Sequence, residues 1–226
     1  MLLPIYEVLS VDDIAQCHTL LQQAQWEAGA LTAGSQAAQV KSNLQLNDGS
    51  ASAVAMRQLI LKKLSTHPLF ISSALPNKIF PPKFNCYQDE GFYGLHVDSA
   101  LMNLVDGSYL RTDISATLFL NNSDDYEGGE LTIETQYGAQ SLKLNAGDLI
   151  LYPSTSLHEV KPVTQGRRLC AFFWIQSMVQ SVFCREQLFE LDQSIQKLTL
   201  ERGVSDSEVK RLSGVYHNLL REWAQV

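Results

Sequence analysis

Apolar residues recur at helical spacing near the start of the chain. Within residues 10–26 they are Val11, Ile14, Ala15, Leu20, Leu21 and Ala24. This spacing, with Ser10 as a cap and two aspartates in the first turn, predicts a helix over that range. A second helix is predicted from Ala53 to Leu64, ending before Pro68. The segment between them, residues 26–43, predicts a strand and a loop.

Helical spacing returns near the end of the chain. It predicts one helix from Arg185 to Leu200 and another that runs to about Trp223. Ser205 and Glu208 have the spacing of a capping box for the last helix. That helix has one apolar stripe, formed by Val209, Leu212, Val215, Leu219 and Trp223. We expect the stripe to pack on the sheet or on a partner subunit, so a homodimer is a further prediction.

The middle of the chain has short β-rich runs separated by turn residues. The runs are "KFNCYQ", "GLHVDS", "DISATLFLN", "ELTIET", "QSLKLN", "DLILYP", "LHEVKPV" and "RRLCAFFWI". Turns such as "DDYEGGE", in which Gly128 and Gly129 suit a hairpin or bulge, connect them. Strands without intervening helices predict a mainly β fold with flanking helices, a double-stranded β-helix or jelly roll. The predicted divisions are a support region (1–78), a jelly-roll core (79–177) and a helical extension (178–226).

Composition and charge limit the classes of function. The chain has 226 residues, 45% hydrophobic and 18% charged, with a net charge of −7. This balance argues against a broad phosphate-binding face, so no nucleic-acid partner is expected. No apolar run is long enough for a bilayer span, the N-terminus lacks signal-peptide features, and the four cysteines show no paired spacing. These features favour a cytoplasmic protein with no membrane partner.

The run "EGFYGLHVDSALM" places His96 and Asp98 two residues apart at the end of a predicted strand. Residues at i and i+2 of a strand share a face, so these two side chains can converge. Of the other histidines, His158 alone lies in the strand-rich zone; His18, His67 and His217 are expected at the surface or at helix caps. Two histidines and one carboxylate form the facial triad of non-haem Fe(II) oxygenases. We therefore predict a metal site at His96, Asp98 and His158.

Such a triad leaves open positions and a residual positive charge on the iron. 2-Oxoglutarate, an anionic chelator, would fill two positions and leave one for O2, and its far carboxylate would need a buried cation. Arg167 and Arg168 follow His158 on the next strand-like run, and arginine binds carboxylates bidentately. Both faces of that run are apolar, so alternation leaves the choice open. A simpler alternative is that Arg168 pairs with Glu159 or Asp148.

Four segments resemble a known family. "YQDEGFYGLHVDSA", "GGEL", "AGDLILYPSTSLHEV" and "GRRLCAFFW" are similar to iron- and 2-oxoglutarate-dependent dioxygenases of the prolyl-4-hydroxylase type. Within these, the chain resembles the bacterial PKHD-type hydroxylases (the PiuC group). The resemblance implies metal ligands at His96, Asp98 and His158, and 2-oxoglutarate binding by Arg168 and Tyr87. It also implies the double-stranded β-helix fold, ascorbate as reductant and a link to iron uptake. Collagen-type relatives carry lysine where Arg168 stands.

The function expected from the residues and the resemblance is hydroxylation of an unactivated C–H bond, with succinate and CO2 as coproducts. The substrate is a small molecule or a peptidyl side chain, and loops 101–111 and 121–127 are expected to wall its pocket. One alternative is a cupin-like hydrolase or isomerase that uses zinc, nickel or manganese. Another is a module that senses iron or 2-oxoglutarate without turnover.

Overall fold

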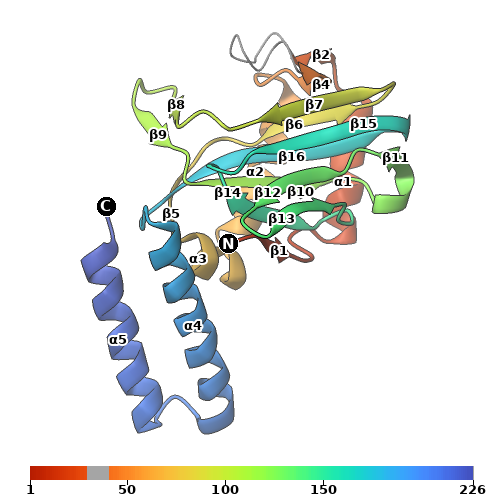
Figure 1. Ribbon diagram of the computed structural model, residues 1–226. Coiled ribbons are helices and arrows are strands. Elements are labelled where there is room, and N and C mark those ends of the chain that lie inside the picture. Colours follow the sequence, from red (N-terminus) through yellow and green to blue (C-terminus); the bar gives the residue numbers. More distant parts are fainter. Residues whose placement is uncertain (30–40, 226) are drawn as a thin grey trace.

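The core of the protein is a sandwich of two antiparallel sheets, seen in a computed structural model that describes residues 1–29 and 41–225 (Figure 1). In the larger sheet the strand order is β1 (Leu3–Ile5), β14 (Leu149–Pro153), β10 (Ile114–Phe119), β16 (Arg168–Ser177), β6 (Lys83–Tyr87), β4 (Leu44–Leu46), β2 (Trp26–Ala28), with β5 (Pro76–Ile79) also on β16. In the smaller sheet it is β13 (Gly138–Leu142), β12 (Leu131–Thr135), β15 (His158–Gly166), β7 (Gly91–His96), β3 (Lys41–Ser42), with β11 (Tyr126–Gly128) on β15. The predicted mainly β, jelly-roll fold with flanking helices is confirmed.

The central strands β10 and β16 are largely buried on both faces, which agrees with the apolar run in the middle of β16; in β10 the buried Ser115 and Thr117 alternate with apolar residues. Side chains alternate along them. Ala116, Leu118 and Phe173 point to a core shared with helices, whereas Ser115 and Arg168 point between the sheets. The larger sheet therefore separates an apolar support layer from the space that holds the polar residues.

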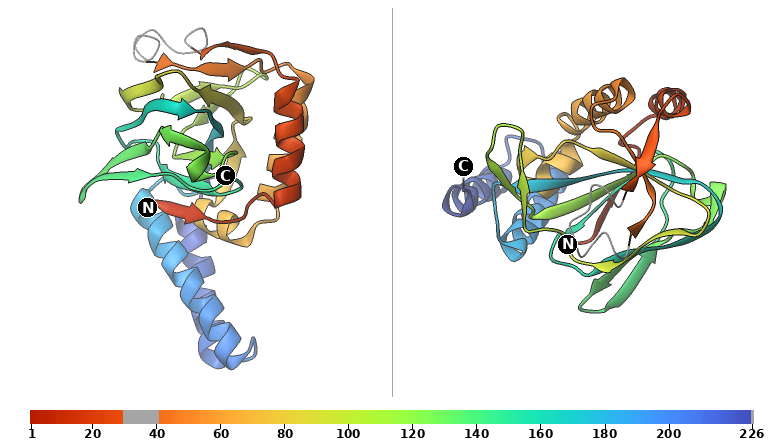
Figure 2. Two further views of the ribbon diagram at one scale, coloured as in Figure 1. Left: turned by 90° about the vertical axis from the view of Figure 1, so that its right-hand side faces the viewer. Right: turned by 90° about the horizontal axis from the view of Figure 1, so that it is seen from above.

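Helices α1 (Val11–Gln22), α2 (Ala51–Leu64) and α3 (Pro68–Ala74) belong to this support layer (Figure 2). Ser10 caps α1, and its side chain and that of Asp13 form a reciprocal capping box. Two expectations are corrected. Helix α1 ends at Gln22, after which Trp26 starts β2, and the chain forms α3 where a plain helix end was predicted. Most of the strand-and-loop region predicted at 26–43 lies outside the described residues.

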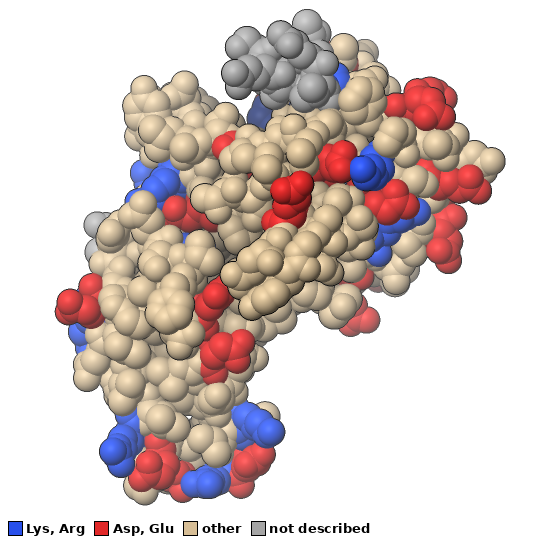
Figure 3. Space-filling model, viewed as in Figure 1, with Lys and Arg blue, Asp and Glu red and all other residues tan. Residues whose placement is uncertain are grey.

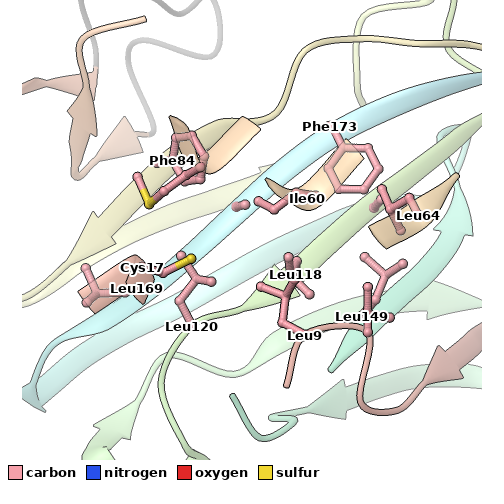
Figure 4. Packing of buried hydrophobic residues seen from close by; sticks show 14 of the residues in the cluster. Leu9, Cys17, Ile60, Leu64, Phe84, Leu118, Leu120, Leu149, Leu169 and Phe173 are labelled. Carbon is pink, nitrogen blue, oxygen red and sulfur yellow. The ribbon is translucent and has the colours of Figure 1, made fainter. Parts of the chain in front are cut away.

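The apolar core between these helices and the larger sheet includes Ile60, Leu64, Leu118 and Phe173 (Figure 4). Ile60 of α2 has no exposed surface. We expect Ile60→Ala to lower the free energy of unfolding by about 2–5 kcal/mol, because it removes buried methyl groups and leaves a cavity. Urea unfolding measures this. Val54→Ala, at a position that is 42% exposed on the same helix, is the control and should change stability by less than about 0.5 kcal/mol; equal losses would contradict the core assignment.

At the C-terminus, α4 (Val182–Arg202) and α5 (Ser207–Trp223) form a helical hairpin that projects from the sandwich (Figure 1). The predicted capping box is wrong: Asp206 caps α5, and its Oδ1 accepts the backbone N–H groups of Glu208 and Val209 at 2.9 and 3.1 Å. The stripe on α5 packs partly within the chain, since Leu219 and Trp223 contact the cluster formed by Leu75, Val179 and Leu188. A subunit interface there stays a prediction.

Charged side chains of both signs share the face drawn in Figure 3, and the cysteines are free thiols. On the face in Figure 3, Lys and Arg of the described residues lie among Asp and Glu rather than in one broad patch. All four cysteines are free thiols, and Cys17, Cys86 and Cys170 are buried. Within residues 1–29 and 41–225, no helix combines the length and apolar character needed to cross a bilayer.

Candidate active site

His96, Asp98 and His158 meet at one end of the space between the sheets. His96 ends β7 and His158 begins β15, and the two residues are directly paired across these strands. Asp98 follows β7 by two residues, so it reaches the pair from the strand's end rather than from within the strand. Its Oδ1 lies 3.9 Å from His96 Nε2 and its Oδ2 lies 3.8 Å from His158 Nε2. One ligand atom from each residue lies within 4.8 Å of the others, a spacing that could hold a metal ion.

The two imidazole rings are held in one orientation. The Nδ1 atom of His96 lies 2.8 Å from the carbonyl oxygen of Gly94, and that of His158 lies 3.0 Å from the carbonyl oxygen of Ser156. A carbonyl only accepts, so Nδ1–H donates and the lone pair is on Nε2, on the side of Asp98. Burial, with a further contribution from His158, lowers the pKa of His96 to about 4. The ring is therefore neutral at pH 7, the form that binds metals.

Neighbouring side chains support all three groups. Tyr93 stacks on the His96 ring, with centroids 3.6 Å apart and planes at 18°. Ser115 Oγ donates to Asp98 Oδ2 at 2.5 Å and lies 2.8 Å from Ser154 Oγ. The carboxylate is thus fixed from the larger sheet while the histidines are fixed from the smaller one.

This support leads to a prediction for Ser115→Ala. Loss of the hydrogen bond to Asp98 should weaken Fe(II) affinity about 10- to 100-fold, as for other groups that orient metal ligands. Anaerobic metal titration followed by calorimetry measures the change. Ser141→Ala removes a hydroxyl that contacts Thr132 away from the cavity and serves as the control. Unchanged affinity in Ser115→Ala would show that Asp98 needs no support from the larger sheet.

The cluster opens into a cavity of about 390 Å³ between the sheets. Arg168 lines its far part and is only 1% exposed. Its Nη1 lies 3.1 Å from Cys170 Sγ, and its guanidinium lies over the rings of Tyr87 and Phe119, at 5.3 and 5.2 Å. Arg168 Nε and Nη2 are buried without a hydrogen-bond partner among the described residues. A buried guanidinium with two free donors is prepared for a planar anion.

The structure separates the two arginines. Arg167 is exposed and contacts Cys86 Sγ at 3.5 Å, on the opposite face of β16. The alternative in which Arg168 pairs with Glu159 or Asp148 is wrong. Glu159 pairs with Lys161 at 2.6 Å, and Asp148 accepts backbone N–H groups.

Tyr87 lies beside Arg168, because the two residues are paired between β6 and β16. Its hydroxyl accepts a hydrogen bond from Asn85 Nδ2 at 3.1 Å and keeps its own proton to donate. Burial raises the pKa of Tyr87, so this proton is retained at neutral pH. The position therefore allows a second donor to a ligand held by Arg168.

Gly129 leaves room for Arg168. Its φ is +66°, and a Cβ atom there would lie 3.0 Å from Arg168 Cδ and from Tyr126 Cε2. The Tyr126 hydroxyl is buried beside Arg168, makes no hydrogen bond of full geometry among the described residues, and was not predicted from the sequence. The Gly128–Gly129 pair was the signal in the sequence for this position, but it was interpreted only as a hairpin or bulge. A bulge is present as well, because the register of β11 shifts beside Gly128.

Only one of the two loops expected to wall the cavity does so. Residues 101–111 form a hairpin of β8 (Leu101–Asn103) and β9 (Tyr109–Arg111), and β8 lines the cavity. Residues 121–127 do not line it. Lys41 of β3 does, although it lies where the sequence pattern was weakest.

The remaining histidines lie away from the cavity. The Nε2 atom of His18 is 2.7 Å from the carbonyl oxygen of Leu120, so this half-buried residue is not a simple surface residue. His67 caps α3, and His217 is exposed on α5. None of the three contributes to the metal-binding cluster.

Comparison with known proteins shows the family of this chain. Residues 82–176 match the 2OG-Fe(II) oxygenase superfamily, and residues 184–225 match the PKHD-type hydroxylase C-terminal domain. A PKHD-type hydroxylase of Pseudoalteromonas atlantica is 57% identical, over 99% of both chains. The chain belongs to the PKHD-type hydroxylase family. A second such hydroxylase, from Teredinibacter turnerae, is 54% identical over the full length of both chains. This PKHD-type hydroxylase is thus an enzyme of the 2OG-Fe(II) oxygenase class, a class defined by iron and 2-oxoglutarate.

Solved structures show the same fold. A Pseudomonas putida prolyl-4-hydroxylase is 19% identical, with a TM-score of 0.53 over 78% of this chain and 92% of that one. The non-heme α-ketoglutarate-dependent carbocyclase SnoK is 13% identical, with a TM-score of 0.57 over 79% and 80%. At these sequence identities the similarity shows a shared jelly-roll fold and says nothing about the substrate.

Proposed function

We propose that this PKHD-type hydroxylase binds Fe(II) through His96, Asp98 and His158, and binds 2-oxoglutarate through Arg168 with Tyr87 as a further contact. It hydroxylates an unactivated C–H bond of a small molecule or peptidyl side chain and releases succinate and CO2. The observation that carries this proposal is the buried, unpaired guanidinium of Arg168 in the same cavity as the three-residue cluster.

The donor set fits Fe(II). Two imidazole Nε2 atoms and one carboxylate lie together on the lining of the cavity, so further ligands could reach a bound metal from the cavity. The hydrogen bonds of the two Nδ1 atoms leave both Nε2 atoms with a lone pair and make them good metal ligands. Sites made only of thiolates or only of oxygen ligands favour other metals. The combination of two imidazoles and one carboxylate therefore supports the iron assignment.

The far part of the cavity fits a dicarboxylate. One carboxylate would take the two free donors of Arg168, and the keto acid end would reach the metal cluster. This would satisfy Arg168, which otherwise remains an uncompensated buried charge. The Tyr87 hydroxyl could donate to the same ligand.

When bound, iron and 2-oxoglutarate supply oxygen activation coupled to oxidative decarboxylation. The protein's own part is to hold the cosubstrate at Arg168, fix the imidazole and carboxylate orientations, and exclude water with the rings of Tyr87, Phe119 and Tyr152. Ascorbate as reductant and a link to iron uptake rest on family resemblance alone. A cytoplasmic location and a homodimer stay predictions.

The proposal is tested by adding Fe(II) and 2-oxoglutarate to the protein without oxygen. We expect a charge-transfer band in the visible region, bleached by O2 with release of succinate. Turnover with zinc, nickel or manganese instead, and no band with iron, would favour the cupin-like alternative. A band without succinate, across broad panels of added compounds, would favour the sensing module.

A further inference from the structure

Lys41 places a second cation in the cavity. It lies on β3 of the smaller sheet, directly paired with Tyr93. Its Nζ is 5.3 Å from the Tyr93 ring and 5.8 Å from the Phe172 ring of the larger sheet. The ammonium group therefore lies between the two sheets, on the lining of the same cavity as the metal cluster.

No carboxylate of the described residues pairs with Lys41. Its hydrogen-bond partner is the neutral Gln45 Oε1, at 3.3 Å. The neighbouring Lys83 instead pairs with Asp48 Oδ2 at 2.5 Å. Burial, with a smaller contribution from Lys83, lowers the pKa of Lys41 to about 8. The group is still mostly protonated at pH 7; Asp98 attracts it from a distance, but no carboxylate of the described residues forms an ion pair with it.

The cosubstrate does not supply a counter-ion. The charges of Fe(II), Asp98, a 2-oxoglutarate dianion and Arg168 cancel, which leaves the Lys41 ammonium uncompensated. Lys41 also lies beside Phe172, four residues along β16 from Arg168, which is about 13 Å along the backbone of the strand.

The wall next to Lys41 is aromatic and lies near the metal ligands. Trp174 packs edge-on against Phe172 and Phe80, with both pairs of centroids 5.5 Å apart. Trp174 is paired with Ser115, whose hydroxyl binds Asp98. Leu101 of β8 also lines the cavity. A ligand here meets Lys41, an apolar surface, and Lys83, which is paired with Phe172 across the sheet and already bound to Asp48.

We infer that the hydroxylated substrate carries a carboxylate that binds the Lys41 ammonium, attached to an apolar body that packs on Phe172 and Trp174. This inference rests on the proposed function and adds a class of substrate to it. The carboxylate satisfies the unpaired cation, and the aromatic wall holds the C–H bond beside the metal ligands. Lys41 is then a specificity-determining residue.

The test uses a matched pair of probes, 4-phenylbutanoate and the neutral 4-phenylbutanamide. Both are titrated calorimetrically into protein loaded with Ni(II), which is inert to oxygen here, and 2-oxoglutarate. We expect the acid to bind at least about tenfold more tightly than the amide, from one charge-assisted contact. Lys41→Met should remove this preference, Lys41→Arg should keep it, and both should bind 2-oxoglutarate within about twofold of wild type.

Equal binding of the pair, no binding of the acid, or a preference that survives Lys41→Met would overturn the inference. If Lys41→Met weakens 2-oxoglutarate binding as much as loss of Arg168 does, Lys41 belongs to the cosubstrate site and the inference is also wrong. Failure to load 2-oxoglutarate would contradict the proposed function instead. The same titration in unloaded Arg168→Met protein, with and without Lys41→Met, tests the carboxylate preference independently of loading.

Discussion

Asp98→Ala is expected to abolish the visible band formed anaerobically with Fe(II) and 2-oxoglutarate. Asp98 provides the one anionic ligand, and its oxygens lie 3.9 and 3.8 Å from the two histidine Nε2 atoms. Loss of a ligand should cost more than the 10- to 100-fold typical of supporting groups, so Fe(II) affinity should fall by more than about 100-fold. His96→Ala and His158→Ala should behave alike. Metal titration and absorption spectra measure both effects.

His217→Ala is the matched control, because this histidine is exposed on α5 and outside the metal-binding cluster. It should keep the band and the affinity of the wild type. Circular dichroism checks that each variant is folded. A folded Asp98→Ala protein with an unchanged band would place the iron elsewhere.

Arg168→Met is expected to weaken 2-oxoglutarate binding by about 2–5 kcal/mol, roughly 30-fold to several thousand-fold. The cosubstrate carboxylate would then be buried without its cation. The same substitution should raise the stability of the unloaded protein by about 1–3 kcal/mol, since it removes a buried charge with two unpaired donors. Calorimetric 2-oxoglutarate titration and urea unfolding measure the two effects, which have opposite signs.

Arg167→Met provides the comparison at the neighbouring position, one residue before β16. Arg167 is exposed on the other face, so its loss should change 2-oxoglutarate affinity by less than about twofold. If both variants lose affinity equally, the assignment of Arg168 is wrong. If Arg168→Met loses stability instead of gaining it, the guanidinium has a structural partner in the unloaded protein.

Much of the fold was predictable because its signals are local. Short alternating runs predicted the strands, and Ser10 marked the start of α1. Errors occurred where two similar signals competed. Ser205 and Asp206 are both good caps, and the structure uses Asp206. Helix α3 follows His67, where a proline was taken as an end although proline is also favoured in a first helical turn.

The site was predictable only in part, because its geometry depends on pairing between distant strands. Alternation could not choose between Arg167 and Arg168, since β16 is buried on both faces and both faces read as apolar. The choice needs the sheet order, which turns Arg168 toward the cavity. Lys41 gave no signal either, because it reaches the cavity only through the pairing of β3 with β7.

A crystal structure of the anaerobic Fe(II)–2-oxoglutarate complex, with anomalous diffraction at the iron edge, tests the central claim most directly. We predict one iron peak within bonding distance of His96 Nε2, His158 Nε2 and an Asp98 carboxylate oxygen. We also predict a 2-oxoglutarate carboxylate about 2.7–2.9 Å from Arg168 Nε and Nη2. An iron peak away from these three residues, or a cosubstrate that leaves Arg168 unpaired, would contradict the account.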